Sequence, residues 1–551
     1  MELFLDVFGF AAVVLRGFVL TGVGVCLGGV LFAYLVALPT LDPSREADRA
    51  VLAKSARLIV ICAWCLALAA VAAAGLDVTV LITTIEVSWG SALTAEFAQA
   101  GELMTVAAIA VAILAPAIAR GERSVPLLVG AVALLVASVA TTHAAARLED
   151  RAILLAASAM HQAGAAAWIG GIPFFLYALA NHDGMERRQA LALRYSHVCA
   201  FAVGLILVSA AIKYVKYIGG ADAIYGTSYG MMSLTKFMMF ASLLAFGAGN
   251  AWAVRRMAGD GALALRTRRF AEVELGVGIT VFFCAASLTS QPPAVDLTQD
   301  RVTWDRVMYR VLMPSLPRIV SPEHKLLGIP QEQARLNQIA AEKRDEAPLA
   351  YVPGYGIPGP STAADIEWSE YNHNGSGIFV FAIGLLALLY RTGKAPWANH
   401  WPLLFVVLAV LIMIRADPEA WPLGPLGFWE SMRAQEVLQH RLATLLVAIF
   451  GILEWRVRAG GLGKSGLAYV FPVSNAIGGV LLLTHTHALA NVQEALLEEM
   501  NHLPIGLFAM GAGYARWLEL RGTPSVKRIA GWVWPLCFIG VGLVLMNYRE
   551  S

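Results

Sequence analysis

The chain has 551 residues, of which 58% are hydrophobic and only 15% are charged, and its formal net charge is +2. A soluble globular protein has about 45–50% apolar and about 25% charged residues, so this composition excludes an ordinary soluble domain. The small net charge gives no reason to expect a nucleic-acid partner. The expected partner is membrane lipid.

Apolar runs close to the about 20 residues that a helix needs to cross a bilayer recur along the chain. The predicted spans of the front half lie near residues 9–39, 53–76, 102–120, 125–147, 152–179, 196–218, 232–254 and 270–290. Those of the back half lie near residues 376–391, 401–415, 435–456, 467–490, 503–519 and 530–547. The sequence therefore predicts an all-α integral membrane protein, a polytopic bundle of about fourteen transmembrane helices in two halves.

Two stretches between these runs differ in composition. Residues 77–101 contain Glu86, Trp89 and Glu96, and we expect an interfacial or partly inserted connection there. Residues 291–371 are charged, rich in proline and soluble in character. We therefore expect an eight-span membrane domain, a linker and a six-span membrane domain, at residues 1–294, 295–371 and 372–551.

Lysine and arginine collect beside the spans, and the side on which they collect is normally cytoplasmic. The strongest cluster lies between the seventh and eighth spans, at Arg255, Arg256, Arg266, Arg268 and Arg269. The other clusters fall on the same side of a fourteen-span arrangement. Both termini and the linker are therefore predicted to face the periplasm.

Four charged residues lie within predicted spans, namely Arg16, Lys236, Glu274 and Glu454. Each is within about two helical turns of a span end. Long side chains in such places can reach the interface while their stems stay in the apolar layer. We expect these four to do so.

Seven of the eleven histidines lie at or near the predicted periplasmic ends of the spans. They are His143, His161, His373, His440, His485, His487 and His502. A single histidine at a helix end is usually an interfacial polar residue, whereas ionisable residues kept inside a membrane usually serve function. Because seven converge on one face, we predict that they are metal ligands.

The segment LLLTHTHALANVQEALLEEMNH, residues 481–502, holds the densest group of these candidates. His485 and His487 are two residues apart, about 200° around a regular helix, so both can bind one ion only where the helix ends. If the residues that follow are helical, Glu494, Glu498 and His502 share one face.

Met500 adds a thioether to this segment. Together with Glu494 and Glu498 it forms a secondary set of candidate ligands, although the two glutamates also fit an amphipathic surface helix. Imidazole, thioether and carboxylate together suit copper, and zinc, nickel and iron remain open on ligand type alone.

In the front half, His143 and His161 lie on predicted antiparallel neighbours joined by a short turn. Their depths differ by about 10–15 Å at about 1.5 Å per residue, which is too far for one ion but suits two successive stations on an inward path. The small residues after His161, from Gly164 to Gly171, are expected to let helices approach closely.

Four segments of the front half carry a recognisable pattern, at residues 161–175, 194–215, 225–250 and 268–294. They include HQAGAAAWIGGIPFF and RRFAEVELGVGITVFFCAASLTSQPPA. On these motifs, residues 1–294 resemble the copper-resistance protein D family, CopD, and the back half resembles the C-terminal extension of some members. The resemblance implies copper transport or handling at the bacterial inner membrane, often beside a periplasmic copper-binding partner.

Three functions fit these features. The first is copper transport without ATP hydrolysis, because neither a Walker A motif nor an Asp-Lys-Thr-Gly-Thr loop is present, and a transporter is favoured over an enzyme. The second is a haem-binding redox protein, in which His143 with His161, or His440 with His485 or His502, are axial ligands. The third is a copper-delivery or assembly factor that does not transport.

Overall fold

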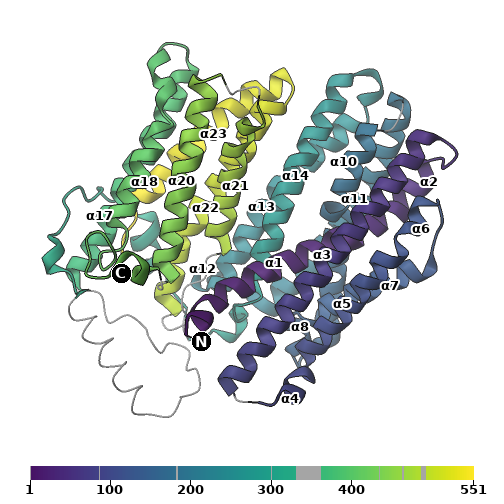
Figure 1. Cartoon of the computed structure of the whole chain (residues 1–551), viewed down its shortest axis with the longest axis horizontal. Helices are drawn as coiled ribbons and strands as arrows, with labels where there is room; N and C mark the ends of the chain where they lie inside the picture. The colour runs from purple at the N-terminus through teal and green to yellow at the C-terminus, as the bar shows by residue number, and fades with distance from the viewer. Residues whose placement is uncertain are drawn as a thin grey trace. The chain divides into compact units, whose positions relative to one another are not determined.

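The computed structural model describes residues 2–85, 87–181, 184–299, 301–329, 362–432, 435–461, 465–484 and 492–550. Within these ranges every regular element is a helix and no strand occurs, which confirms the predicted all-α class (Figure 1). The chain divides into a front unit, residues 10–224 and 232–298, and a back unit, residues 1–9, 225–231 and 299–551. The three predicted domains stay a prediction.

Long helices form most of the front unit. They are α1 (Glu2–Phe32), α3 (Glu46–Ile85), α5 (Glu96–Leu114), α7 (Val125–Ala140), α9 (Arg151–Ala165), α10 (Ile172–Asn181), α11 (Met185–Lys213), α13 (Ser228–Val254) and α14 (Gly261–Leu288). Short elements join or extend them: η1 (Ala33–Ala37), α2 (Leu38–Thr40), α4 (Trp89–Leu93), α6 (Pro116–Ala119), α8 (His143–Ala146), η2 (Ala166–Gly170), η3 (Tyr214–Ile218), α12 (Ala221–Gly226), η4 (Met257–Gly259) and η5 (Ala294–Asp296).

Glycines allow backbones to touch in this unit. A Cβ atom on Gly170 would lie 1.9 Å from the carbonyl oxygen of Gly24, and one on Gly28 would lie 2.3 Å from that of Ala166. Any larger side chain would force α1 away from η2, the π-helix that directly follows the helix of His161. The predicted packing role of the glycine-rich segment is thereby confirmed.

The back unit contains a second helical bundle. Its main helices are α17 (Ala363–Arg391), α18 (Leu403–Arg415), α20 (Gln435–Ala459), α21 (Val470–Thr484), α22 (Val492–Arg521) and α23 (Pro524–Met546). Short elements accompany them: α15 (Trp304–Val307), η6 (Met308–Leu312), η7 (His324–Leu326), η8 (Pro396–His400), α19 (Phe428–Ser431) and η10 (Gly466–Tyr469). Aromatic rings fill the centre, with Phe405 4.8 Å from Phe450 and Trp401 5.3 Å from Trp534 between ring centroids.

Ten helical stretches of the described chain are long and apolar enough to cross a membrane, and α7 and α18 are apolar but shorter. The protein is therefore a multi-pass membrane protein. Each of the predicted spans contains a helix. This includes α20 and α22, which are longer than α7 and α18 but less apolar than they are. The count of about fourteen crossings stays a prediction.

Two predicted boundaries are wrong. Helix α3 continues to Ile85, so the first part of residues 77–101 is regular helix rather than a connection. Helix α7 ends at Ala140, seven residues before the predicted end of its span. There the hydroxyls of Thr141 and Thr142 donate to the carbonyls of Ser138 and Val139 and satisfy the end of the helix locally.

Candidate functional site

His161 lies on α9 and is held by a serine from the neighbouring helix α11. Its Nδ1 is 3.0 Å from Ser209 Oγ, and that hydroxyl donates its single hydrogen to the carbonyl of Ile206 at 2.9 Å. The imidazole Nδ1–H must therefore donate to Ser209. In the neutral ring this leaves Nε2 as the nitrogen with a lone pair for a metal.

The charged groups around His161 are cationic. The ammonium groups of Lys213, on α11, and Lys236, on α13, lie close enough to act on the ring electrostatically. Like charges repel, and more strongly in a region of low dielectric constant. A metal cation at His161 would be repelled by either lysine in its protonated form.

His143 lies on the short helix α8 and is partly buried. Its Nε2 is 3.5 Å from the carbonyl oxygen of Leu288, and its ring meets Tyr217 edge to face at 6.4 Å. Burial lowers the pKa of His143, the positive charges of Arg147 and Arg16 lower it further, and the hydrogen bond to Leu288 offsets part of this. His143 is therefore uncharged at neutral pH, with partners separate from those of His161.

His440, on α20, is paired with a buried carboxylate. Its Nδ1 is 2.6 Å from Asp417 Oδ1, and Asp417 is only 5% exposed whereas the imidazole is 49% exposed. Because a carboxylate accepts, Nδ1 carries the hydrogen and a metal would be bound through Nε2. A carboxylate behind the imidazole orients the ring and raises its basicity, as it does behind many metal-binding histidines.

His373, on α17, is fixed by its own helix and by the end of the chain. Its Nδ1–H donates to the carbonyl of Ser369 at 2.9 Å, and its ring stacks on Tyr548 at 3.9 Å. Glu550 accepts from the hydroxyls of Ser369 and Tyr548, at 2.6 Å each. His440 and Glu550 both act electrostatically on His373.

The remaining candidates lie on or before α22. His485 and His487 fall outside the described residues, as do the side chains of Glu494 and Glu498. The helix that the prediction required is present from Val492 onward. His502 is partly buried on it, and Met500 is 2% exposed in an apolar cluster with Val302, Val307, Leu496 and Leu497.

Among the described residues, no three histidine, cysteine or acidic side chains form a group that could hold a metal ion. Within that part of the chain, the rings of His161, His373 and His440 are each oriented by a hydrogen bond at Nδ1. Sequence reasoning missed Asp417, Ser209 and Glu550, which orient them. The run DPEAWPLGP, residues 417–425, was the available signal for Asp417.

The expectation that the charged residues within spans reach the interface is wrong for both glutamates. Glu274 is 4% exposed and accepts from Trp168 Nε1 at 3.0 Å and from Asn250 at 2.5 Å. Glu454 is 1% exposed and pairs with Arg458 and Arg516 at 2.7 and 3.0 Å. A carboxylate stem is too short to reach water from these positions, so each group is paired with internal donors.

The fold defines a multi-pass helical membrane protein with histidines among its helices. Residues 189–288 match the family model Copper resistance protein D, CopD. The chain therefore contains a CopD family domain, which confirms the resemblance seen in the sequence.

A curated relative also points to copper transport proteins. Over 163 residues the chain is 30% identical to the copper transport protein CutJ of Bacillus subtilis (strain 168), and it is distantly homologous to that protein. The alignment covers 29% of this chain and 29% of the relative, so the chain matches less than a third of the relative's length. No solved structure matches the chain.

Proposed function

We propose that this protein binds copper beside His373 and His440 and moves it across the bacterial inner membrane. The observation that carries the proposal is the pairing of His440 Nδ1 with the buried Asp417 carboxylate, and His440 also acts electrostatically on His373. The CopD domain and the relative named as a copper transport protein support copper as the cargo. Imidazole nitrogen is among the ligands that copper favours.

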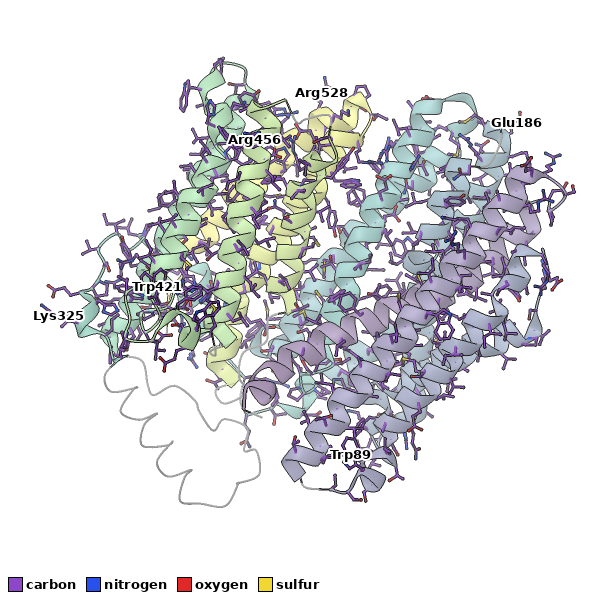
Figure 2. The ribbon with its side chains drawn as sticks, in the orientation of Figure 1. Trp89, Glu186, Lys325, Trp421, Arg456 and Arg528 are labelled. Atoms are coloured by element: carbon purple, nitrogen blue, oxygen red, sulfur yellow. The ribbon has the colours of Figure 1, made fainter. Side chains whose placement is uncertain are left out.

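In this proposal copper enters from the periplasm. Figure 2 shows Trp421, close in sequence to Asp417, at one end of the back unit and Arg456 and Arg528 at the other. By the positive-inside rule the arginine-rich end faces the cytoplasm, so the end with Asp417 faces the periplasm. A periplasmic copper-binding protein would be the donor, and His485, His487 and His502 stay candidate additional ligands.

His161 is a separate candidate station, in the front unit. It offers one oriented nitrogen, and two neighbouring lysines act on its ring, so we expect an ion to bind there weakly and to be released readily. Transport requires sites that are favourable enough to enter and weak enough to leave. With no ATP-hydrolysing motif in the sequence, ligand exchange down a gradient drives the movement.

Copper uptake into proteoliposomes tests this function. We expect the His373→Ala/His440→Ala variant to lose most uptake, because the capture site is gone. His197→Ala is the matched control, since His197 is an exposed histidine of α11 outside the proposed path, and it should transport normally. Uptake at the original rate by the double variant, or a Soret band from bound haem in the purified protein, would contradict the proposal.

A further inference from the structure

An open surface cavity of about 540 Å³ lies at the end of the back unit away from Trp421. It is lined by Arg391 of α17, Glu519 of α22, Gly522, and Pro524, Lys527 and Arg528 of α23. Figure 2 shows Arg528 at this end of the bundle. None of these residues belongs to the proposed copper path, so the cavity needs its own explanation.

Arg391 is fixed in the wall of this cavity. Its guanidinium pairs with Glu519 at 2.5 Å and donates to the carbonyl of Arg528 at 3.1 Å. It also lies over the ring of Trp532, 5.4 Å from the centroid. A Cβ atom on Gly531 would lie 2.0 Å from the guanidinium, so the glycine lets Arg391 cross α23 at close range.

The charges that line the cavity do not balance. The single carboxylate, Glu519, is already bound by Arg391, by Arg516 at 2.6 Å and by Trp534 at 2.7 Å. The side chains of Lys527 and Arg528 are exposed, and no ion pair involves them within the described ranges. The Nε–H of Arg391 is buried without an acceptor there. The lining therefore carries an excess of two positive charges, which suits an anion.

The next turns of α23 face an apolar environment. Ile529, Trp532, Val533 and Leu536 are large exposed hydrophobic residues on this helix, and Tyr390 is another on the adjoining end of α17. In a multi-pass membrane protein such a surface faces acyl chains, and aromatic rings collect at the level of the headgroups. The cavity therefore lies where a lipid headgroup ends and its chains begin.

From this arrangement we propose that the cavity binds the phosphate of an anionic phospholipid, whose acyl chains lie along α23. Arg391 and Arg528 supply planar guanidinium groups that suit phosphate oxygens, and Lys527 adds a point charge. Basic pockets between helices on the cytoplasmic side are a recurring form of lipid recognition. Arg391 is held ready by Glu519, so little order is lost on binding.

Thermal unfolding of the purified full chain in detergent, with added lipid, tests the proposal. We expect phosphatidylglycerol to raise Tm by several degrees relative to equal phosphatidylcholine, because a ligand that binds only the folded state stabilises it. The Lys527→Gln/Arg528→Gln variant should lose most of this rise. Both side chains are exposed, so the variant is expected to fold. Lys394→Gln/Arg456→Gln is the matched control, since it removes two exposed charges outside the cavity and should keep the rise.

The same measurement distinguishes a phospholipid headgroup from free phosphate. Inorganic phosphate at the same concentration should leave Tm unchanged, because it lacks the acyl chains that α23 would cover. An equal rise with inorganic phosphate would assign the cavity to a soluble phosphate compound and overturn the lipid proposal. An equal rise in the Lys527→Gln/Arg528→Gln variant, or the same Tm with both lipids, would overturn it altogether.

Discussion

His161 in the front unit and His440 in the back unit are both oriented imidazoles, yet different kinds of side chain surround them. A hydroxyl holds His161 and two lysines act on it, whereas a buried carboxylate holds His440. A negative charge behind a ligand strengthens cation binding, and positive charges beside it weaken cation binding. In the proposed function, His440 therefore serves capture and His161 serves passage.

This contrast shows that the partner on Nδ1 says more about a histidine than its depth in the membrane. By sequence both residues were candidate metal ligands, with His161 deeper in its span than His440. The partner of His440 Nδ1 is Asp417, 23 positions away along the chain, and that of His161 Nδ1 is Ser209, 48 positions away. Four variants test or refine the contrast, beginning with the largest expected effect.

Replacing Asp417 with Asn should weaken copper binding about 10–100-fold, the usual effect of removing the group that orients a metal-binding histidine. The amide keeps the shape but removes the charge behind His440. Competition with a chromophoric copper chelator measures the affinity. Asp305→Asn, an exposed aspartate of the same unit, serves as the control. Unchanged affinity in Asp417→Asn would show that the carboxylate serves the fold alone.

Replacing Ser209 with Ala should lower copper transport about tenfold while copper capture stays unchanged, because the orientation of His161 is lost. Proteoliposome uptake and equilibrium binding, measured on the same preparation, separate the two quantities. Ser242→Ala is the matched control, since Ser242 is a partly buried serine of α13 whose hydroxyl donates to the carbonyl of Met239. A parallel loss of binding would place His161 in the capture site and remove the contrast.

Replacing Lys213 with Gln should slow the release of copper from His161 by a few-fold, because one opposing charge is removed. The rate of release to a chelator after loading reports this step. Lys216→Gln provides the comparison, since Lys216 pairs with Asp150 at 2.6 Å near the same helix end. Faster release in Lys213→Gln would mean that the lysine assists binding.

The smallest effect concerns His143 and pH. Because its folded pKa lies below the ordinary value of about 6.5, the unfolded chain takes up the proton first as pH falls. The stability that neutral His143 contributes is thus present above pH about 6.5 and is lost as pH falls through the folded pKa. The fall in Tm between neutral and acidic pH should therefore be smaller for the His143→Gln variant than for the original protein. An identical fall in Tm in both proteins would contradict the lowered pKa of His143 in the folded state.

Hydropathy predicted where the helices are, because the bilayer requires each crossing segment to satisfy its own backbone and to be apolar. It could not predict where they end. Thr141 and Thr142 end α7 through local hydrogen bonds, and α3 continues past its apolar core. The candidate ligands were found as residue types near a predicted membrane face, and their grouping into one metal site stays a prediction.

The partners of those ligands could not be predicted, since they come from separate elements. Asp417 reaches His440 from the loop before α19, and Glu550 reaches the surroundings of His373 from beyond α23. The buried Glu274 and Glu454 were misassigned for the same reason. Their donors, Trp168 and Asn250 for one and Arg458 and Arg516 for the other, are recognisable only once the helices are packed.

The ligands of bound copper test the central claim most directly. X-ray absorption spectroscopy of the copper-loaded protein should show imidazole nitrogen in the first coordination sphere. That signal, and the bound copper, should be lost in His373→Ala/His440→Ala and kept in His161→Ala. The same copper content and the same spectrum in the His373→Ala/His440→Ala variant would contradict the claim that the back unit captures the metal.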